Sequence, residues 1–265
     1  MSSAYLLVSH GSRDPRPQRA MEKLAQLVRE RLEIRRLTRT VTENKYQAND
    51  AKTSTVVIDS SWYPLVDTAV LELASIPLHE QIREFANLAL AMGCHQIKLL
   101  PVFLLPGVHV MEDIPAEVAI AQESLGTAIK IQQLPHLGSH PNFKQLLISQ
   151  DSQLEADAKI LLSHGTRRAG GNEPIEVLAD SLGAVAAYWS IPPTLEEQVE
   201  VLTGNGYRRI SVLPYFFFQG GITDAIAQKV VDLKLQFPTV QLRLAEPIGV
   251  TVELANLIVD WFEGK

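Results

Sequence analysis

The feature that most constrains this chain of 265 residues is that it repeats itself. The segment LLVSHGSRDPRP at 6–17 resembles LLSHGTRRAGGN at 161–172, and LLPVFLLPG at 99–107 resembles VLPYFFFQG at 212–220. In both halves an Ile-Pro pair also precedes a polar, helix-forming stretch. Because three blocks recur in the same order, we interpret the chain as an internal duplication of one folding unit.

Within each half, short apolar runs alternate with stretches whose apolar residues recur at helical spacing. We predict strands near 4–9, 68–75, 96–103, 128–134, 158–163, 184–190, 208–214 and 239–245. We predict helices near 17–32, 78–92, 112–124, 172–183, 194–204, 222–236 and 249–262. Continuous apolar strands between helices are typical of parallel sheets covered on both faces. The predicted fold is therefore α/β, with two similar domains that each hold a four-stranded parallel sheet flanked by helices.

The duplication also predicts how the chain is divided. We expect an N-terminal repeat over 1–145 and a C-terminal repeat over 158–265, joined by the polar segment around 145–157. The first repeat carries about 39 additional residues, within roughly 33–67, and they are rich in Thr, Asn, Lys, Asp and Ser. Such a composition is typical of a surface excursion or flexible loop, with a lid or an oligomer contact as the alternatives.

Composition excludes several classes of protein. A net charge of −6 argues against a nucleic-acid binder with a basic surface. The single cysteine, Cys94, excludes an intrachain disulfide and an iron–sulfur cluster held by several cysteines. No apolar run reaches about 18 residues and the N-terminus lacks a basic segment, so we expect no membrane span, no signal peptide and a cytoplasmic location. Neither a P-loop nor a dinucleotide fingerprint follows a strand, so we expect no nucleotide.

Three polar side chains follow predicted strands of the first half. His10 comes directly after the first strand, Glu72 interrupts the end of the second apolar run, and His109 follows a Pro-Gly turn after the third. Ligands bind α/β sheets outside the carboxyl ends of the strands. Two imidazoles and a carboxylate there could hold a divalent metal ion and accept protons. Singly, each also has a structural interpretation: a helix cap, a buried ion pair and a loop histidine.

The duplication separates these interpretations. Applying the offsets between the repeats, the first histidine is matched by His164, whereas Glu72 is matched by Ala187 and His109 by Ile222. Side chains needed only for folding would be expected in both halves. We therefore predict one working site in the first half and a degenerate counterpart in the second.

The blocks LLVSHGSRDPR, LELA…IPLHEQI and LPVFLLPGVHVMEDIP resemble those of the class II tetrapyrrole chelatases. More narrowly, they resemble the sirohydrochlorin cobaltochelatases and ferrochelatases in their long, two-repeat form, over about 220 residues in both halves. The resemblance implies an ATP-independent enzyme that inserts Fe²⁺ or Co²⁺, and Ni²⁺ in vitro, into sirohydrochlorin for siroheme or cobalamin biosynthesis. In this interpretation the metal is a substrate, no other cofactor is needed, and the chain is a monomer.

The resemblance also implies roles for individual residues. His10 and His109 would be the metal-handling histidines, His10 would also accept a proton, and Glu72 would be the carboxylate of the cleft. The implied substrate pocket is formed by Leu104, Leu105, Pro106, Gly107 and Val108.

Sirohydrochlorin is a polycarboxylate, so an acidic chain needs local cations to bind it. Arg13 and Arg16 follow the first His-Gly pair, and Arg167 and Arg168 follow the second. All four precede predicted helix N-termini, which favour anions, and arginine can bind a carboxylate through two parallel hydrogen bonds. We predict that Arg13 and Arg167 contact the substrate, assisted by His164; the alternative is that these arginines are only solvated.

Other signals and other functions are weaker. His136 and His140 are spaced like ligands but are separated by Gly138, and Phe216–218 are expected to pack in the core. Histidine phosphatases also place His-Gly after their first strand, but with an arginine before the histidine, where this chain has serine. A non-catalytic carrier of a tetrapyrrole or a metal ion, using the same cleft, remains the alternative function.

Overall fold

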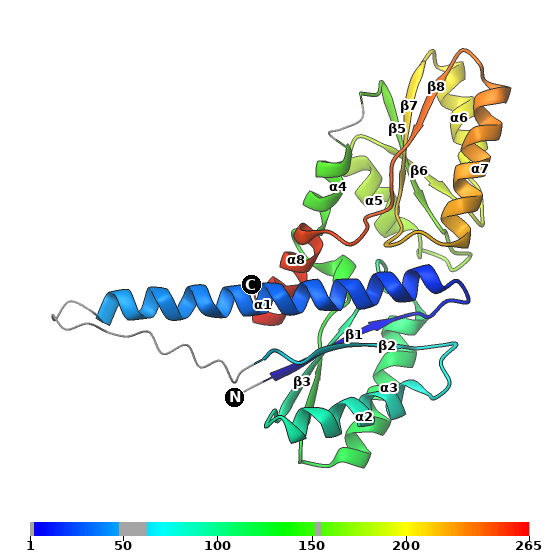
Figure 1. Cartoon of the computed structure of the whole chain (residues 1–265). Coiled ribbons are helices and arrows are strands. Elements are labelled where there is room, and N and C mark those ends of the chain that lie inside the picture. Colours follow the sequence, from blue (N-terminus) through cyan, green and yellow to red (C-terminus); the bar gives the residue numbers. More distant parts are fainter. Residues whose placement is uncertain (1–2, 48–62, 152–154, 265) are drawn as a thin grey trace.

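The computed structural model describes residues 3–47, 63–151 and 155–264, which form two lobes (Figure 1). The first half contains β1 (Ser3–Ser9), α1 (Pro15–Gln47), β2 (Val66–Val70), α2 (Leu78–Ala91), β3 (Gln96–Pro101), the π-helical turn η1 (His109–Asp113), α3 (Ile114–Leu125), β4 (Lys130–Gln133), the 3-10 turn η2 (Leu137–Ser139) and α4 (Phe143–Asp151). The second half contains β5 (Ala158–Ser163), α5 (Glu173–Ser181), β6 (Val185–Tyr188), α6 (Leu195–Gly204), β7 (Arg209–Pro214), α7 (Gly221–Gln236), β8 (Gln241–Leu244) and α8 (Val252–Glu263).

The two halves contain sheets of the same topology. The strand order is β2-β1-β3-β4 in the first and β6-β5-β7-β8 in the second, and all neighbouring strands are parallel. In β1 the consecutive residues Leu6, Leu7 and Val8 are all buried, because the sheet is covered on both faces. The predicted fold class of two four-stranded parallel sheets flanked by helices is confirmed.

Two local predictions are wrong. Helix α1 continues to Gln47, so the first part of the expected surface loop at 33–67 is helical, and residues 48–62 lie outside the described residues. Strand β2 ends at Val70, where the chain bends, instead of continuing to 75. The first part of the joining segment at 145–157 is helical, because α4 extends to Asp151. The division into repeats at 1–145 and 158–265 stays a prediction.

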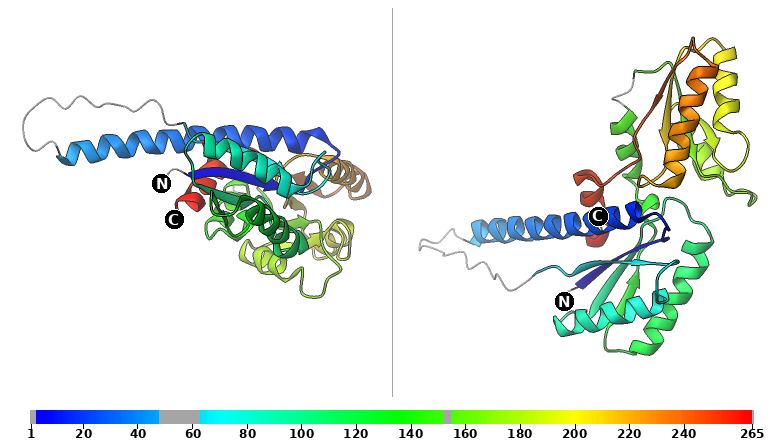
Figure 2. Two further views of the ribbon diagram at one scale, coloured as in Figure 1. Left: turned by 90° about the horizontal axis from the view of Figure 1, so that it is seen from below. Right: turned by 45° about the vertical axis from the view of Figure 1, so that its right-hand side comes forward.

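The last helix of each half packs on the other half. Helix α8 lies beside α1, where Arg35 pairs with Asp260 at 2.6 Å and Arg31 Nε donates to Asn256 Oδ1 at 2.8 Å. Conversely, Phe143 at the start of α4 packs on Phe217 of the second half, with 6.0 Å between the two ring centroids. Residues of α1, α4 and α8 belong to one apolar core that the two halves share. This core joins the lobes at their junction, near α1 and α8 (Figure 2).

Candidate metal and tetrapyrrole site

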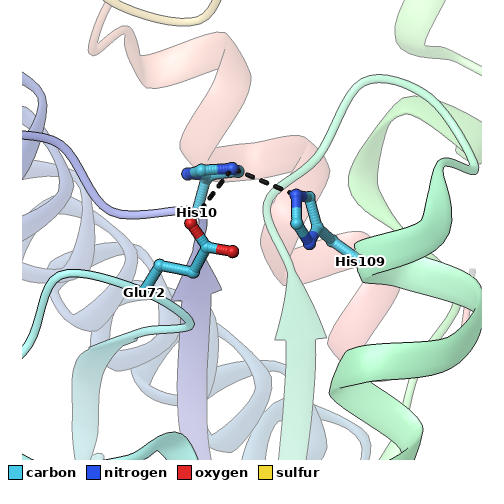
Figure 3. A group of neighbouring side chains, drawn as sticks. All are labelled: His10, Glu72 and His109. Carbon is cyan, nitrogen blue, oxygen red and sulfur yellow. Dashed lines mark hydrogen bonds and ion pairs between the residues drawn. The ribbon is translucent and has the colours of Figure 1, made fainter.

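The three side chains predicted to converge lie together at the carboxyl edge of the first sheet. His10 is the first residue after β1, Glu72 lies two residues after β2, and His109 begins η1 after β3 (Figure 3). The Nε2 atoms of the two histidines are 3.1 Å apart, and His10 Nε2 is 3.9 Å from Glu72 Oε2. Because parallel strands end at the same edge, three segments distant in sequence deliver their side chains to one point.

A close backbone contact holds the first two groups in register. The Glu72 N–H donates to the carbonyl of His10 at 2.9 Å, extending the pairing of β1 with β2 beyond the strands. Gly11, at φ +103°, passes so near that a Cβ there would lie 2.1 Å from the Glu72 carbonyl oxygen. Only glycine fits this turn, because it tolerates positive φ and has no side chain to clash.

The geometry suits a cation. Two ligand atoms about 2.1 Å from one ion, at an angle of roughly 90–110°, lie about 3.0–3.4 Å apart. The observed 3.1 Å between the imidazole nitrogens fits this range. Among the described residues, this trio is the only group of three or more such side chains whose ligand atoms approach within 4.8 Å of one another. Imidazole and carboxylate bind Fe²⁺, Co²⁺, Ni²⁺ and Zn²⁺ without the tight hold of thiolates.

The cluster is open to solvent. The side chains of His10 and Glu72 are 49% and 50% exposed, and that of His109 is 35% exposed. Structural metal sites are closed by protein ligands, whereas sites that do chemistry keep positions open for an incoming group. This arrangement therefore suits an ion that is passed on more than one that stabilises the fold.

A cavity of about 790 Å³ lies between the two halves; its lining includes Val108, which directly precedes His109, but none of the three cluster side chains. One wall contains Leu105, Pro106, Gly107 and Val108, four of the five residues predicted for the substrate pocket. Leu104 does not line this cavity; it is half-buried against the core that joins the halves, and its backbone contacts the turn at Gly138. The volume lies within the range of pockets for small ligands and cofactors.

The opposite wall comes from the second half and contains one of the four arginines. Arg168 lines the cavity with Thr166, whereas Arg13, Arg167 and His164 do not. We predicted that Arg167, after the second His-Gly pair, contacts the substrate. In the structure the next residue, Arg168, is the one that lines the cavity. The sequence could not distinguish them, because the direction of each side chain depends on the loop that ends at α5.

Arg16 is engaged elsewhere. Its guanidinium binds Asp14 and, across the junction of the halves, Asp224 near the start of α7, each at 2.5 Å. The hydrogen bond from Arg16 lowers the pKa of Asp14 to about 2. This arginine therefore connects the lobes and is not available for a substrate carboxylate.

A second, smaller cavity of about 270 Å³ is lined by His10 itself. Its wall includes Phe216, Phe217 and Phe218, which pack against the apolar cores as expected and also line this cavity. Strand β7 ends at Pro214, so these half-buried rings lie in the loop beyond it and face the first half. The sequence contained one signal for this location. The repeat aligns Phe216–218 with residues 103–105, which lead into the predicted substrate pocket of the first half.

The second half lacks most of this site. His164 follows β5 as expected, and its Nδ1 lies 3.0 Å from the Gly165 carbonyl oxygen. The match of Glu72 with Ala187 is wrong: Ser190 donates its N–H to the His164 carbonyl as Glu72 does to that of His10. The segment after β6 is shorter than that after β2, which displaced the alignment. A hydroxyl thus replaces the carboxylate in the second half.

The fold and the cluster define a two-repeat α/β protein with an open group of potential metal ligands and a cavity between its halves. A family model described as CbiX matches residues 4–153 and 158–263, and the chain belongs to this family. The resemblance found in the sequence is thus confirmed at the level of the family.

Relatives and solved structures are similar over most of the chain. The sirohydrochlorin cobaltochelatase of Priestia megaterium is 22% identical, covering 97% of this chain and 78% of that protein. The sirohydrochlorin ferrochelatase of the same organism is 23% identical, covering 74% and 76%. The sirohydrochlorin chelatase SirB from Bacillus subtilis subspecies spizizenii, solved in complex with cobalt, is 20% identical with a TM-score of 0.63, covering 99% and 94%. No helix among the described residues is long and apolar enough to cross a membrane.

Proposed function

We propose that this protein inserts a divalent metal ion, Fe²⁺ or Co²⁺, into sirohydrochlorin without a nucleotide. The observation that carries the proposal is the open cluster of His10, Glu72 and His109 beside a cavity of about 790 Å³. The names of the two Priestia megaterium relatives support the same substrate and leave both metals open. Imidazole and carboxylate ligands do not choose between iron and cobalt, since availability and geometry decide this in cells.

The reaction exchanges one M²⁺ for two protons of the pyrrole N–H groups. His10 and His109 hold the ion through Nε2 while the pyrrole nitrogens replace water and protein ligands. Once its Nε2 is displaced from the ion, His10 accepts one of the two protons, because a neutral imidazole is an effective base near neutral pH, and water at this open site accepts the other. Glu72 lies 3.9 Å from His10 Nε2 and stabilises the imidazolium that forms. Since both side chains are half-exposed, the protons pass to solvent.

The cavity orients the ring. Leu105, Pro106 and Val108 offer an apolar wall for the macrocycle, and Arg168 offers a cation on the opposite wall. An arginine that binds a peripheral carboxylate through two hydrogen bonds would fix the ring's rotation above the cluster. The second half thus contributes to substrate placement, although its own metal ligands are missing.

The deciding experiment is anaerobic metal insertion into sirohydrochlorin, followed by absorbance, with Co²⁺, Fe²⁺ and Ni²⁺ supplied separately and no nucleotide. We expect His10→Ala and His109→Ala to abolish insertion and His164→Ala to reduce it less. His95→Ala, at an exposed histidine outside the cleft, is the matched control and should be unchanged. Equal loss in all three cleft variants would contradict a single site in the first half.

The alternative is a carrier that binds a tetrapyrrole or a metal ion in the same cleft. The same assay separates the two functions, because a carrier would bind sirohydrochlorin without accelerating metallation above the spontaneous rate. That result would overturn the chelatase proposal, and the cluster would then be a holding site.

We also infer that the protein acts as a monomer. Both walls of the cavity come from one chain, one wall from each half. A second copy is therefore not needed to complete the site. Light scattering coupled to gel filtration should give a mass near 29.3 kDa; a stable dimer would contradict this inference.

A further inference from the structure

One more ionisable side chain, Asp113, contacts the metal cluster from behind. Its Oδ2 lies 2.7 Å from Nδ1 of His109, while Nε2 of the same ring faces His10. Asp113 itself is not part of the cluster of potential ligands. The ring of His109 therefore lies between His10 and this carboxylate, and contacts each through a different nitrogen.

The local backbone places this carboxylate. His109 and Asp113 are the first and last residues of the π-helical turn η1, in which the Ile114 N–H donates to the His109 carbonyl. Side chains four residues apart lie on the same face of a helix, so the two groups meet. Single π-helical turns are rare and are frequently found at functional sites.

The second half provides an internal comparison. The offset that relates β3 to β7 matches His109 with Ile222 and Asp113 with Ile226, a core residue that is 1% exposed. There, α7 is α-helical from Gly221 onward, without a π-helical turn at its start. The imidazole, the carboxylate and the unusual turn are thus found together in one half and are together lacking in the other. This pattern indicates that they work as a unit.

The chemistry of the pair defines its role. An ionised carboxylate only accepts hydrogen bonds, so the Nδ1 that it contacts must carry the proton. Nε2 then presents its lone pair, which is the form that binds a metal ion. A carbonyl near Nδ1 has the same effect in His10, where Gly11 O lies at 3.2 Å. In His109 the partner of Nδ1 is the carboxylate of Asp113.

We propose that Asp113 is the positioning residue of the metal site. It fixes the Nδ1–H tautomer of His109 and holds the ring with Nε2 toward His10. The inference rests on the proposed function only in treating His109 as a metal ligand. Removing such a partner behind a ligating histidine typically lowers metal affinity or activity by about 10–100-fold.

The test compares Asp113→Ala, Asp113→Asn and the control Glu123→Ala, which removes an exposed carboxylate from α3. Long-range ¹H–¹⁵N spectra of the metal-free protein report which nitrogen of His109 carries the proton. Cobalt affinity is measured separately by visible absorbance, with Co²⁺ and protein alone. Because Asp113 is 45% exposed, its replacement should leave the fold intact, which circular dichroism checks.

We expect Asp113→Ala to redistribute the proton between the two nitrogens and to weaken Co²⁺ binding by about 10–100-fold. Asp113→Asn should retain the Nδ1–H tautomer, since its amide oxygen can still accept, and should lose less affinity; Glu123→Ala should match the native protein. An unchanged tautomer in Asp113→Ala, or an asparagine variant as weak as the alanine variant, would overturn the inference. Neither readout uses sirohydrochlorin, so a failure of chelatase activity would overturn the proposed function separately.

Discussion

The contact between Gly11 and Glu72 makes a backbone substitution the sharpest test of the site. Gly11→Ala adds one methyl group at φ +103°, where it would lie 2.1 Å from the Glu72 carbonyl oxygen and 3.0 Å from its carbon. Real Cβ atoms essentially never approach another heavy atom closer than 3.0 Å. The turn after β1 and the turn after β2 must therefore separate by about 1 Å.

The expected magnitudes follow from this displacement. Positive φ costs an alanine about 1–2 kcal/mol, and forcing extra volume into a tight contact costs about 1–3 kcal/mol. We expect a total loss of about 2–5 kcal/mol in the free energy of unfolding. A misplacement of about 1 Å at a reacting centre can lower the rate by about 10²-fold, so metal insertion should fall by that factor.

Gly93→Ala is the matched control. Gly93 has φ +74° at the end of α2, and a Cβ there would meet nothing within 4 Å. The free energy of unfolding of the Gly93→Ala variant should fall by about 1–2 kcal/mol, from backbone strain alone, and its activity should be unchanged. Urea unfolding and the insertion assay are measured on both variants. If Gly11→Ala inserts metal within about threefold of Gly93→Ala, the turn does not control the position of Glu72, and the geometric argument fails.

Three further outcomes can be checked with the same assays. Asp224→Asn should lower the midpoint of denaturation slightly at low salt and not at high salt, because its pair with Arg16 is exposed and screened. Burial lowers the pKa of His140, so at acidic pH the folded protein binds fewer protons than the unfolded chain. The free energy of unfolding should therefore fall by up to about 1.4 kcal/mol per pH unit as the pH drops below about 6.5. His140→Asn should flatten this slope in urea titrations. Arg168→Ala should raise KM for sirohydrochlorin with little change in kcat, whereas Arg167→Ala should change neither.

The alternation of strands and helices and the convergence of the site were predictable because they depend on local pattern and simple topology, whereas the order of the strands in each sheet was not predicted. His10, Glu72 and His109 each follow an apolar run, and parallel strands bring such positions to one edge. The internal repeat then distinguished His109 from a structural loop histidine, since Ile222 occupies the equivalent position.

The errors arose where tertiary contacts decide. The alignment of Glu72 failed because the segment after β6 is shorter than that after β2, and only strand register shows that Ser190 is its counterpart. Arg16 seemed equivalent to its neighbours in sequence, yet its partner Asp224 is 208 residues away. Asp113 could have been noticed from its spacing to His109, but its role depends on the π-helical turn.

Duplication explains why one half could lose its ligands without losing its turn. Gly165 keeps positive φ, at +79°, and His164 keeps the contact of its Nδ1 with the following carbonyl. The loop that begins there runs to α5, and its residue Arg168 lines the cavity wall opposite Leu105 and Val108. Under the proposed function, one metal site serves the cavity that the two halves share, and a second set of ligands would have no separate substrate. The turn after β5 is still needed, because it shapes the far wall of that cavity.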